Sequence, residues 1–193
     1  MARLILIRHA ETDWNLEGRW QGQADVPLNV SGLKQAERMA KTTARLGLTA
    51  LYSSDLRRAT QTAEAIARQT GLAIQFDPRL REIDQGEWEG MFVEDIQTRY
   101  ADIFQRRKAD PWGVSPPGGE TALQVNKRVL AAIRDIIQQH PEGVIGIVSH
   151  GFSLAVTIAH YQGHPINEVW NLIPENCQVI EIEGVHEKGV NNF

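Results

Sequence analysis

The chain has 193 residues, of which 42% are hydrophobic and 23% are charged, as is typical of a globular domain. Its net charge of −4 and pI of about 5.9 argue against a nucleic-acid partner or an anionic membrane surface. No apolar run approaches the roughly 20 residues that cross a bilayer. Cys177 is the single cysteine, so an intrachain disulfide is excluded and we expect a cytoplasmic protein.

The first half of the chain alternates short apolar runs with helical patterns. In chain order, the predicted elements are a strand at residues 4–7, a loop at 18–30, a helix from Ser31 to Leu46, a strand at 50–53, a helix over 56–67 and a strand at 72–76. The first run is too short for the core of a signal peptide. Ser31 is predicted to cap the first helix, and Gly47 and Gly71 follow the two helices as stop signals.

The second half begins less regularly. Its predicted elements are a loop at 81–91, a helical stripe at 93–104, a turn-rich connection at 110–119, a helix at 121–140, a strand at 144–148, a helix at 152–161 and a last strand at 177–182. This alternation predicts an α/β fold, a three-layer α/β/α sandwich with a mostly parallel central sheet. We expect residues 1–193 to form a single domain, in which residues 80–119 interrupt the alternation as a partial cap over the active site.

Polar side chains follow the predicted strands where the strands end. In chain order these are Arg8 and His9, the pair Arg57 and Arg58, Glu82, and His150. Because the carboxyl ends of parallel strands meet at one edge of a sheet, we expect these side chains to converge there. Arginine suits an anionic substrate, since its planar fork donates two parallel hydrogen bonds to phosphate. Each residue alone also has an ordinary structural explanation, and Asp84, Glu87 and Glu89 compete with Glu82 for the acidic role.

Other motifs are weak or absent. The chain contains no Walker loop, no G-x-G-x-x-G fingerprint and no G-x-S-x-G elbow. His160 and His164 have the spacing of a helical metal pair, but Gly163 and Pro165 are predicted to end the helix between them. We therefore predict neither a metal site nor a cofactor.

Five segments resemble, in the right order, the motifs of the histidine phosphatase superfamily, in its phosphoglycerate-mutase-like branch. The first, LIRHAETDWN at residues 6–15, is similar to the R-H-G-E-T-x-W-N signature, with Ala10 in place of the usual glycine. The others are QGQADVPL at 21–28, SSDLRRATQTA at 53–63, LREIDQGEWEG at 80–90 and VSHG at 148–151. We expect alanine to be tolerated in the first motif provided that its φ is negative.

The resemblance implies the phosphoglycerate-mutase-like version of the sandwich and a role for each matching residue. It implies catalytic roles for His9, Glu82, His150, Arg8 and Arg58, and substrate binding by Arg8, Asn15, Gln21, Arg58 and His150. His9 would carry the phosphoryl group as the nucleophile. Glu82 would exchange a proton with the leaving group or with water.

The leading hypothesis is a metal-independent phosphatase that hydrolyses small-molecule phosphate monoesters through a phosphohistidine intermediate on His9. The alternatives are a cofactor-dependent phosphoglycerate mutase and a non-catalytic module that binds a phosphorylated ligand. The PPGGET segment at 116–121 resembles a motif common in the phosphatases, whereas Arg106 and Arg107 are similar to a mutase pair that binds the substrate carboxylate. The physiological substrate and the oligomeric state, including a homodimer, stay open.

Overall fold

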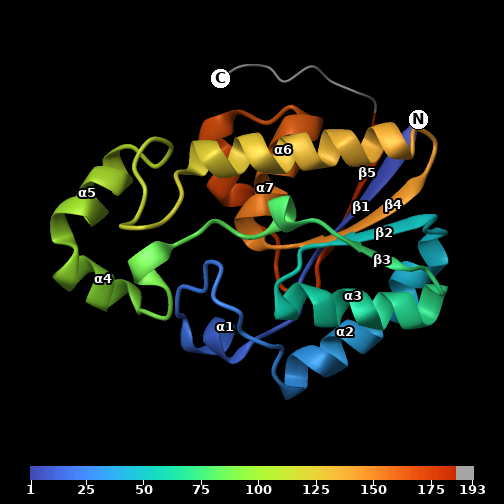
Figure 1. Ribbon diagram of the computed structural model, residues 1–193, viewed down its shortest axis with the longest axis horizontal. Coiled ribbons are helices and arrows are strands. Elements are labelled where there is room, and N and C mark those ends of the chain that lie inside the picture. The colour runs from blue at the N-terminus through green and yellow to red at the C-terminus, as the bar shows by residue number, and fades with distance from the viewer. Residues whose placement is uncertain (186–193) are drawn as a thin grey trace.

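The computed structural model describes residues 1–185, and the last eight residues of the predicted domain lie outside this range. A five-stranded sheet forms the centre of the described chain (Figure 1). Its strands are β1 (Ala2–Arg8), β2 (Ala50–Ser53), β3 (Ile74–Phe76), β4 (Val144–Ser149) and β5 (Val179–Val185), in the order β3-β2-β4-β1-β5. Strands β1 to β4 are parallel, and β5 runs antiparallel to β1 at one edge. The prediction of a mostly parallel sheet is confirmed.

Helices cover both faces of this sheet. Figure 1 shows α2 (Val30–Thr43) and α3 (Arg57–Thr70) on one side, and α6 (Ala122–Gln139) and α7 (Gly151–Gln162) on the other, which confirms the three-layer sandwich. The remaining helices are α1 (Asp13–Glu17), α4 (Val93–Arg99), α5 (Ala101–Ala109) and the 3₁₀ turns η1 (Ala44–Leu46), η2 (Pro78–Leu80), η3 (Gly86–Trp88) and η4 (Ile166–Leu172). Helices α4 and α5 lie away from the sheet, at the left of Figure 1. None of the helices described here combines the length and the apolar character needed to cross a membrane.

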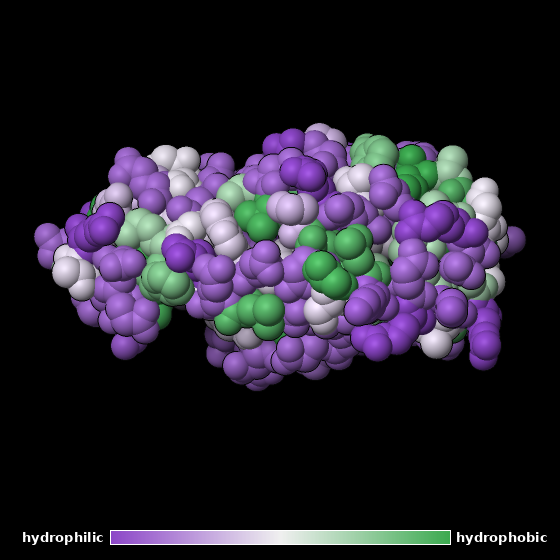
Figure 2. Space-filling model, turned by 90° about the horizontal axis from the view of Figure 1, so that it is seen from below, coloured by the Kyte–Doolittle hydropathy of each residue, from purple (hydrophilic) through white to green (hydrophobic). Residues whose placement is uncertain are grey.

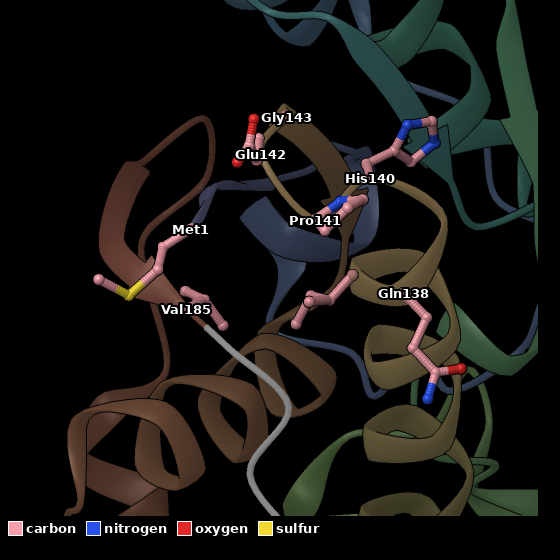
Figure 3. Close-up of a pocket in the computed structure, with 8 residues that line it drawn as sticks. Met1, Gln138, His140, Pro141, Glu142, Gly143 and Val185 are labelled. Carbon is pink, nitrogen blue, oxygen red and sulfur yellow. The ribbon is translucent and has the colours of Figure 1, made fainter.

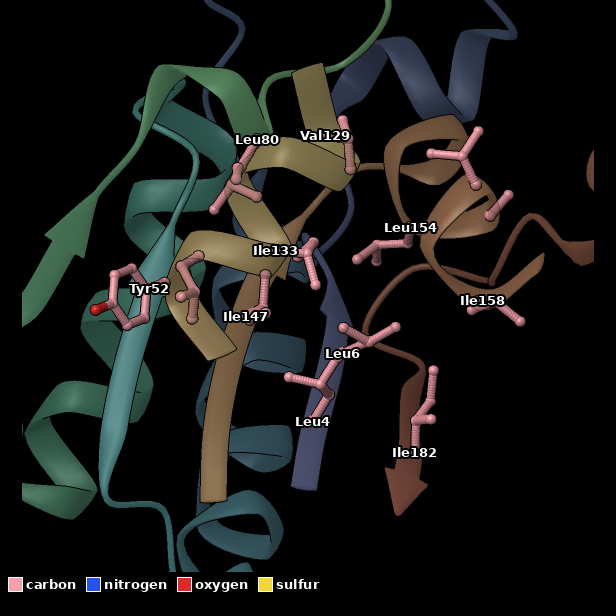
Figure 4. Packing of buried hydrophobic residues seen from close by; sticks show 14 of the residues in the cluster. Leu4, Leu6, Tyr52, Leu80, Val129, Ile133, Ile147, Leu154, Ile158 and Ile182 are labelled. Atoms are coloured by element: carbon pink, nitrogen blue, oxygen red, sulfur yellow. The ribbon is translucent and has the colours of Figure 1, made fainter. Parts of the chain in front are cut away.

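The core has two parts, one on each face of the sheet. Alternate residues of β1 point to opposite faces. Leu4 and Leu6 pack toward α6 and α7, as Figure 4 shows, while Ile5 and Ile7 pack toward α2 and α3. All four are fully buried. A strand covered on both faces is expected to be a continuous apolar run rather than an alternating one.

The outer helices turn their polar sides to solvent. In α3, the buried positions include Ala59, Ala63 and Ile66, which share one face at helical spacing. Figure 2 views the molecule from the side on which α2 and α3 lie, and most of that face is hydrophilic, with hydrophobic residues in small separate groups. The sequence period therefore decides which face of each helix meets the sheet.

Several element boundaries differ from the predicted ones. Helix α2 is capped by Asn29 rather than Ser31: the Asn29 side chain accepts a hydrogen bond of 2.7 Å from the Gly32 amide. The stripe at 93–104 is two helices, because Tyr100 has φ −125° and ψ 35° and interrupts the turn. The predicted loop around residue 18 is preceded by the short helix α1, which begins at a capping box between Thr12 and Asn15.

The last strand also begins later than predicted, at Val179. Cys177 is the only residue other than glycine with a positive φ in the described chain, at 59°. Its amide donates to the carbonyls of Arg8 and His9, at 3.2 and 3.4 Å. The left-handed conformation is incompatible with a strand, so the turn at Cys177 delays β5 and ties the chain to the end of β1.

The core packing predicts an uneven response to truncation. Ile147 on the central strand β4 is fully buried, whereas Val30 at the start of α2 is 72% exposed. We expect Ile147→Ala to lower the free energy of unfolding by about 2–5 kcal/mol, because it leaves a cavity. Val30→Ala, the control, is expected to change it by less than about 0.5 kcal/mol. Urea unfolding measures both; similar losses for the two variants would contradict the assigned core.

Candidate active site

The parallel pairing of β1 with β4 brings two distant histidines together. Arg8 is in register with Ser149, and the His9 amide donates to the Ser149 carbonyl at 3.0 Å. The next residue on each strand end is a histidine, and the rings of His9 and His150 have centroids 5.2 Å apart. The predicted convergence at the carboxyl edge of the sheet is therefore present.

A cavity of about 330 Å³ opens at this edge. Its wall contains six of the seven predicted site residues, namely Arg8, His9, Asn15, Gln21, Arg58 and Glu82. The seventh, His150, is fully buried behind the wall. The other lining residues come from the 19–22 loop, from residues 83 and 85, from the start of α7 and from the region of η4.

His9 is held with one ring nitrogen directed at the backbone. Its Nδ1 lies 2.7 Å from the Ala10 carbonyl oxygen, which fixes the proton on Nδ1 and leaves Nε2 with a free lone pair. The ring is 3% exposed. Burial lowers the pKa of His9 well below its ordinary value, and the nearby guanidinium groups of Arg58 and Arg8 lower it further. A neutral, oriented imidazole is a competent nucleophile.

The alanine that replaces the usual glycine of the first motif causes no backbone strain. Ala10 does not have a positive φ, so the condition for tolerating it is met. Its amide donates to Thr62 Oγ1 at 3.1 Å, and the Thr62 hydroxyl donates to the Arg58 carbonyl at 2.7 Å. Thr62 therefore links the turn after β1 to helix α3.

Arg58 is almost completely buried and is anchored by three hydrogen bonds. Its Nη1 and Nη2 each donate at 2.7 Å to backbone carbonyls, of Ala24 and Gly22, and its Nε donates to His150 Nδ1 at 3.2 Å. A guanidinium has five N–H groups, so two remain for a ligand. Burial lowers the pKa of Arg58 to about 10, which still leaves it charged near neutral pH.

Arg8 supplies the second cation of the wall. Its Nη1 donates to the Pro174 carbonyl at 2.6 Å, and its Nε is buried with no hydrogen-bond partner in the described chain. Burial lowers the pKa of Arg8, while Glu82 opposes that shift. A buried donor without a partner is costly, and an anion in the cavity would satisfy it.

His150 is placed as a neutral ring. Its Nδ1 accepts from Arg58, and its Nε2 lies 2.8 Å from Ser54 Oγ. Burial lowers the pKa of His150 well below its ordinary value, with further lowering by Arg58 and by His9. Both ring nitrogens are therefore engaged, and a ligand can bind His150 only by replacing one of these partners. Direct contact of this ring with phosphate stays a prediction.

Glu82 is the one carboxylate among the residues that line the cavity. Its Oε2 accepts from the Phe152 amide at 3.1 Å, and its Oε1 accepts from the Ile83 and Ser153 amides at 2.9 and 3.3 Å. Two of these donors belong to the first turn of α7, where unpaired amides favour a negative charge. Gly151, the first residue of α7, lies close to this carboxylate: a Cβ there would be in ordinary contact with Glu82 Oε2 at 3.5 Å and would press on Ile173 Cγ2 at 3.0 Å.

The three competing acids are engaged elsewhere. Glu89 accepts from the Gln23 amide at 2.5 Å, Asp84 accepts from the Gly86 amide at 2.8 Å, and Glu87 accepts from the Tyr100 hydroxyl at 2.9 Å. None of them lines the cavity. The choice that the sequence left open therefore falls on Glu82.

Two amide side chains complete the predicted set. Asn15 Oδ1 accepts from the Thr12 amide at 3.1 Å, so the nitrogen of Asn15 is the end left for a ligand. Gln21 Oε1 is buried with no hydrogen-bond partner in the described chain. Both side chains line the cavity, Asn15 as a donor and Gln21 as an amide with an unsatisfied oxygen.

Arg128 on α6 is a positioning residue that sequence reasoning missed. Its Nη1 donates to the carbonyls of Arg79 and Arg81, and its Nη2 donates to the carbonyl of Glu82, all at 2.7 to 2.8 Å. Its Nε and Nη2 also bind the Glu120 carboxylate, at 2.8 and 2.7 Å. Glu120 lies in the PPGGET segment, so this motif fixes the loop that carries Glu82. Ser54, whose Oγ lies 2.8 Å from His150 Nε2, also had no predicted role.

A second cavity, of about 660 Å³, lies at the opposite end of the sheet. Figure 3 shows side chains from both ends of the described chain and from the turn after α6, including Met1, Gly143 and Val185. Met1 and Gly143 precede β1 and β4, so this cavity is at the amino ends of the parallel strands, away from His9.

No group of three or more His, Cys, Asp or Glu side chains in residues 1–185 is arranged to hold a metal ion.

Comparison with known proteins identifies the class. The model of the histidine phosphatase superfamily, branch 1, matches residues 4–192. The chain therefore belongs to the histidine phosphatase superfamily, and it is an enzyme of that class, as its relatives are.

Two relatives that cover nearly all of this chain carry different names. Phosphoserine phosphatase 1 of Hydrogenobacter thermophilus is 35% identical over 185 residues, which cover 95% of this chain and 88% of that protein. "Probable phosphoglycerate mutase GpmB" of Enterobacter sp. is 37% identical over 187 residues, which cover 95% and 85%.

Solved structures agree with the fold. The α-ribazole phosphatase of Shigella flexneri superposes with a TM-score of 0.87 at 28% identity, over 94% of this chain and 90% of that one. A mycobacterial glucosyl-3-phosphoglycerate phosphatase, solved with VO3, gives 0.86 at 29% identity, over 95% and 92%. The predicted cytoplasmic localisation and the predicted lack of a nucleic-acid partner stay predictions, and the oligomeric state stays open.

The lowered pKa values of His9 and His150 predict a pH dependence of stability. Below about pH 6.5 the unfolded chain binds protons on these two rings while the folded chain does not. The free energy of unfolding should therefore fall as the pH drops below that value. Urea unfolding between about pH 8 and pH 5 measures the slope. His9→Asn removes one of the two groups and should make the slope shallower; NMR titration of His9 near its ordinary pKa would contradict the prediction.

Proposed function

We propose that the protein is a metal-independent phosphatase that hydrolyses small-molecule phosphate monoesters through a phosphohistidine on His9. The observation that carries this proposal is the free Nε2 of His9 in a cavity whose wall includes the buried guanidinium groups of Arg8 and Arg58. Two fixed positive charges match the charge of a phosphate monoester dianion. They stabilise the charge on the equatorial oxygens of the transition state, a role that needs no metal in this site.

The chemistry proceeds in two steps. His9 Nε2 attacks phosphorus, the bond between phosphorus and the ester oxygen breaks, and Glu82 gives a proton to the departing alkoxide. The approaching dianion favours the acid form of Glu82, against the amides that favour its charge in the free site. Water then attacks the phosphohistidine, Glu82 takes up its proton, and inorganic phosphate leaves. The side-chain N–H of Asn15 donates a hydrogen bond to a phosphoryl oxygen. The dianion favours protonation of His150, which offsets the effect of burial on that ring.

We also propose that residues 80–119 form a partial cap over the cavity. Glu82, Ile83 and Gln85 line the cavity from this segment. Paired backbone bonds between Trp20 and the 90–91 turn, at 2.7 and 3.0 Å, connect the segment to the loop after β1. The cap is short and leaves water a route to the phosphohistidine. Access of water is needed for hydrolysis to be faster than transfer of the phosphoryl group to a second substrate.

The arginine pair that favoured a mutase lies outside the cavity. Arg106 is exposed on α5 and does not line the wall. Arg107 is buried over the rings of Trp20 and Trp88, at 5.7 and 5.4 Å, and donates to Gln85 Oε1 at 3.0 Å. Neither side chain is placed to bind a substrate carboxylate, which supports hydrolysis over mutase activity.

The non-catalytic alternative is the least supported of the three. A binding module needs donors for the phosphoryl oxygens but has no need of an oriented nucleophile or of a carboxylate beside it. Here His9 has its tautomer fixed by the Ala10 carbonyl, and Glu82 is the single acid on the same wall. Turnover of an aryl phosphate would separate this alternative from the two enzymes.

Replacement of the nucleophile gives the first test. We expect His9→Ala to lose activity and phosphoenzyme formation, because no other side chain on the wall offers a free nucleophilic nitrogen. Rapid quenching with a labelled ester should trap acid-labile, base-stable phosphate on the wild type alone. His164→Ala, a histidine outside this cavity, is the control and should retain both signals. Wild-type turnover by a folded His9→Ala variant would refute the proposal.

The partition between water and a second substrate gives the next test. The enzyme is incubated with 3-phosphoglycerate and catalytic 2,3-bisphosphoglycerate, and both isomerisation and phosphate release are followed. We expect slow or absent isomerisation alongside release of phosphate from other esters. Rapid formation of 2-phosphoglycerate with little free phosphate would establish the mutase instead.

A further inference from the structure

One side of the cavity is apolar and lies outside the set of residues that would hold the phosphoryl group. Phe152 and Trp170 are stacked, with ring centroids 4.5 Å apart and an interplanar angle of 27°. Both line the cavity together with Ile173, which is 38% exposed. We call these three residues the aromatic wall. Its parts come from the first turn of α7, from η4 and from the residue that follows η4.

The aromatic wall is held in place before any ligand arrives. Phe152 is 3% exposed and also packs against Trp112, with centroids 6.2 Å apart. The Phe152 amide donates to Glu82 Oε2 at 3.1 Å, so the wall begins directly beside the carboxylate and two residues after His150. A fixed apolar surface at this place meets whatever group the phosphate is attached to.

Beyond Arg8 and Arg58, the described lining of the cavity has no cation whose charge is unpaired. Apart from Arg8 and Arg58, the one cation among the lining residues is Arg19. Its Nη1 donates to the Gly90 carbonyl at 2.8 Å, its Nε binds Glu17 at 2.5 Å, and its guanidinium lies 4.2 Å from the centre of the Phe92 ring. A carboxylate on the substrate would also meet the negative charge of Glu82.

We propose that the alcohol portion of the substrate carries a planar, uncharged ring that stacks on the aromatic wall. This inference rests on the proposed function, because it takes the phosphoryl group to be held by Arg8 and Arg58. Flat rings pack on flat rings and exclude water from both faces, whereas a carboxylate would lose its hydration and meet only a guanidinium that Glu17 already pairs. A cavity of about 330 Å³ has room for a phosphate and one such ring.

Phosphonates test the wall independently of turnover, because their C–P bond is not hydrolysed. Calorimetry compares 3-phenylpropylphosphonate, propylphosphonate and 4-phosphonobutanoate, which share the phosphoryl group and differ in the far end. We expect the phenyl compound to bind at least tenfold more tightly than the propyl compound, and the carboxylate to bind no more tightly than the propyl compound. Equal affinities for the phenyl and propyl compounds, or tightest binding of the carboxylate, would overturn the inference.

Variants locate the preference. Trp170→Ala should reduce the phenyl-to-propyl affinity ratio at least fivefold, and Trp170→Phe should restore most of it. Phe76→Ala removes a ring on β3 that is 51% exposed and outside the cavity, and should leave the ratio unchanged. A ratio that survives Trp170→Ala in a folded protein would refute the aromatic wall. Tight phenyl binding without hydrolysis of 2-phenylethyl phosphate or of any other phosphate monoester would contradict the proposed function, and the aromatic wall would then stand only as a binding surface for a ring.

Discussion

The parallel pairing of β1 with β4 is the constraint on which the site depends. Their register places Arg8 beside Ser149, and the next backbone bond, from His9 to Ser149, carries the pairing into the site itself. Side chains alternate between the two faces of a strand, so a shift of one residue would exchange the two halves of the core and separate the histidines. The same apolar burial that stabilises the sheet therefore sets the distance between His9 and His150.

The site that results is electrostatically incomplete without a ligand. Arg58 is buried with its charge, and the carbonyls of Gly22 and Ala24 compensate part of the lost hydration. Burial depresses the pKa of both histidines, and the two positive groups depress it further, so the rings stay neutral where an exposed histidine would begin to charge. An incoming dianion reverses this balance. The loop at 18–30 has no hydrophobic periodicity, and it contributes to the site through the backbone oxygens that hold Arg58.

The sequence predicts what depends on local pattern and on strand ends. The apolar run of β1 and the polar pair that follows it are visible without a structure, and so is the helix that starts after His150. The neutral state of His150 was not predictable, because it depends on Ser54 and Arg58, more than 90 positions away along the chain. The Arg128 contacts with the Glu82 loop were missed for the same reason. Local competition decided the cap of α2, where Asn29 and Ser31 were both suitable residues.

The phosphoryl-binding residues and the aromatic wall have different origins in the fold. Arg8, His9 and Arg58 lie at or just after parallel strand ends, and the sheet fixes their positions. Trp170 lies in η4, a connection between α7 and β5 that no strand pairing constrains. Relatives that share the first set can therefore differ in the second. This is consistent with sequence relatives named for phosphoserine and phosphoglycerate, and with structural neighbours named for glucosyl-3-phosphoglycerate and α-ribazole. The aromatic wall is then the part of the cavity least determined by the family, and we infer a planar, uncharged leaving group from this chain's own side chains.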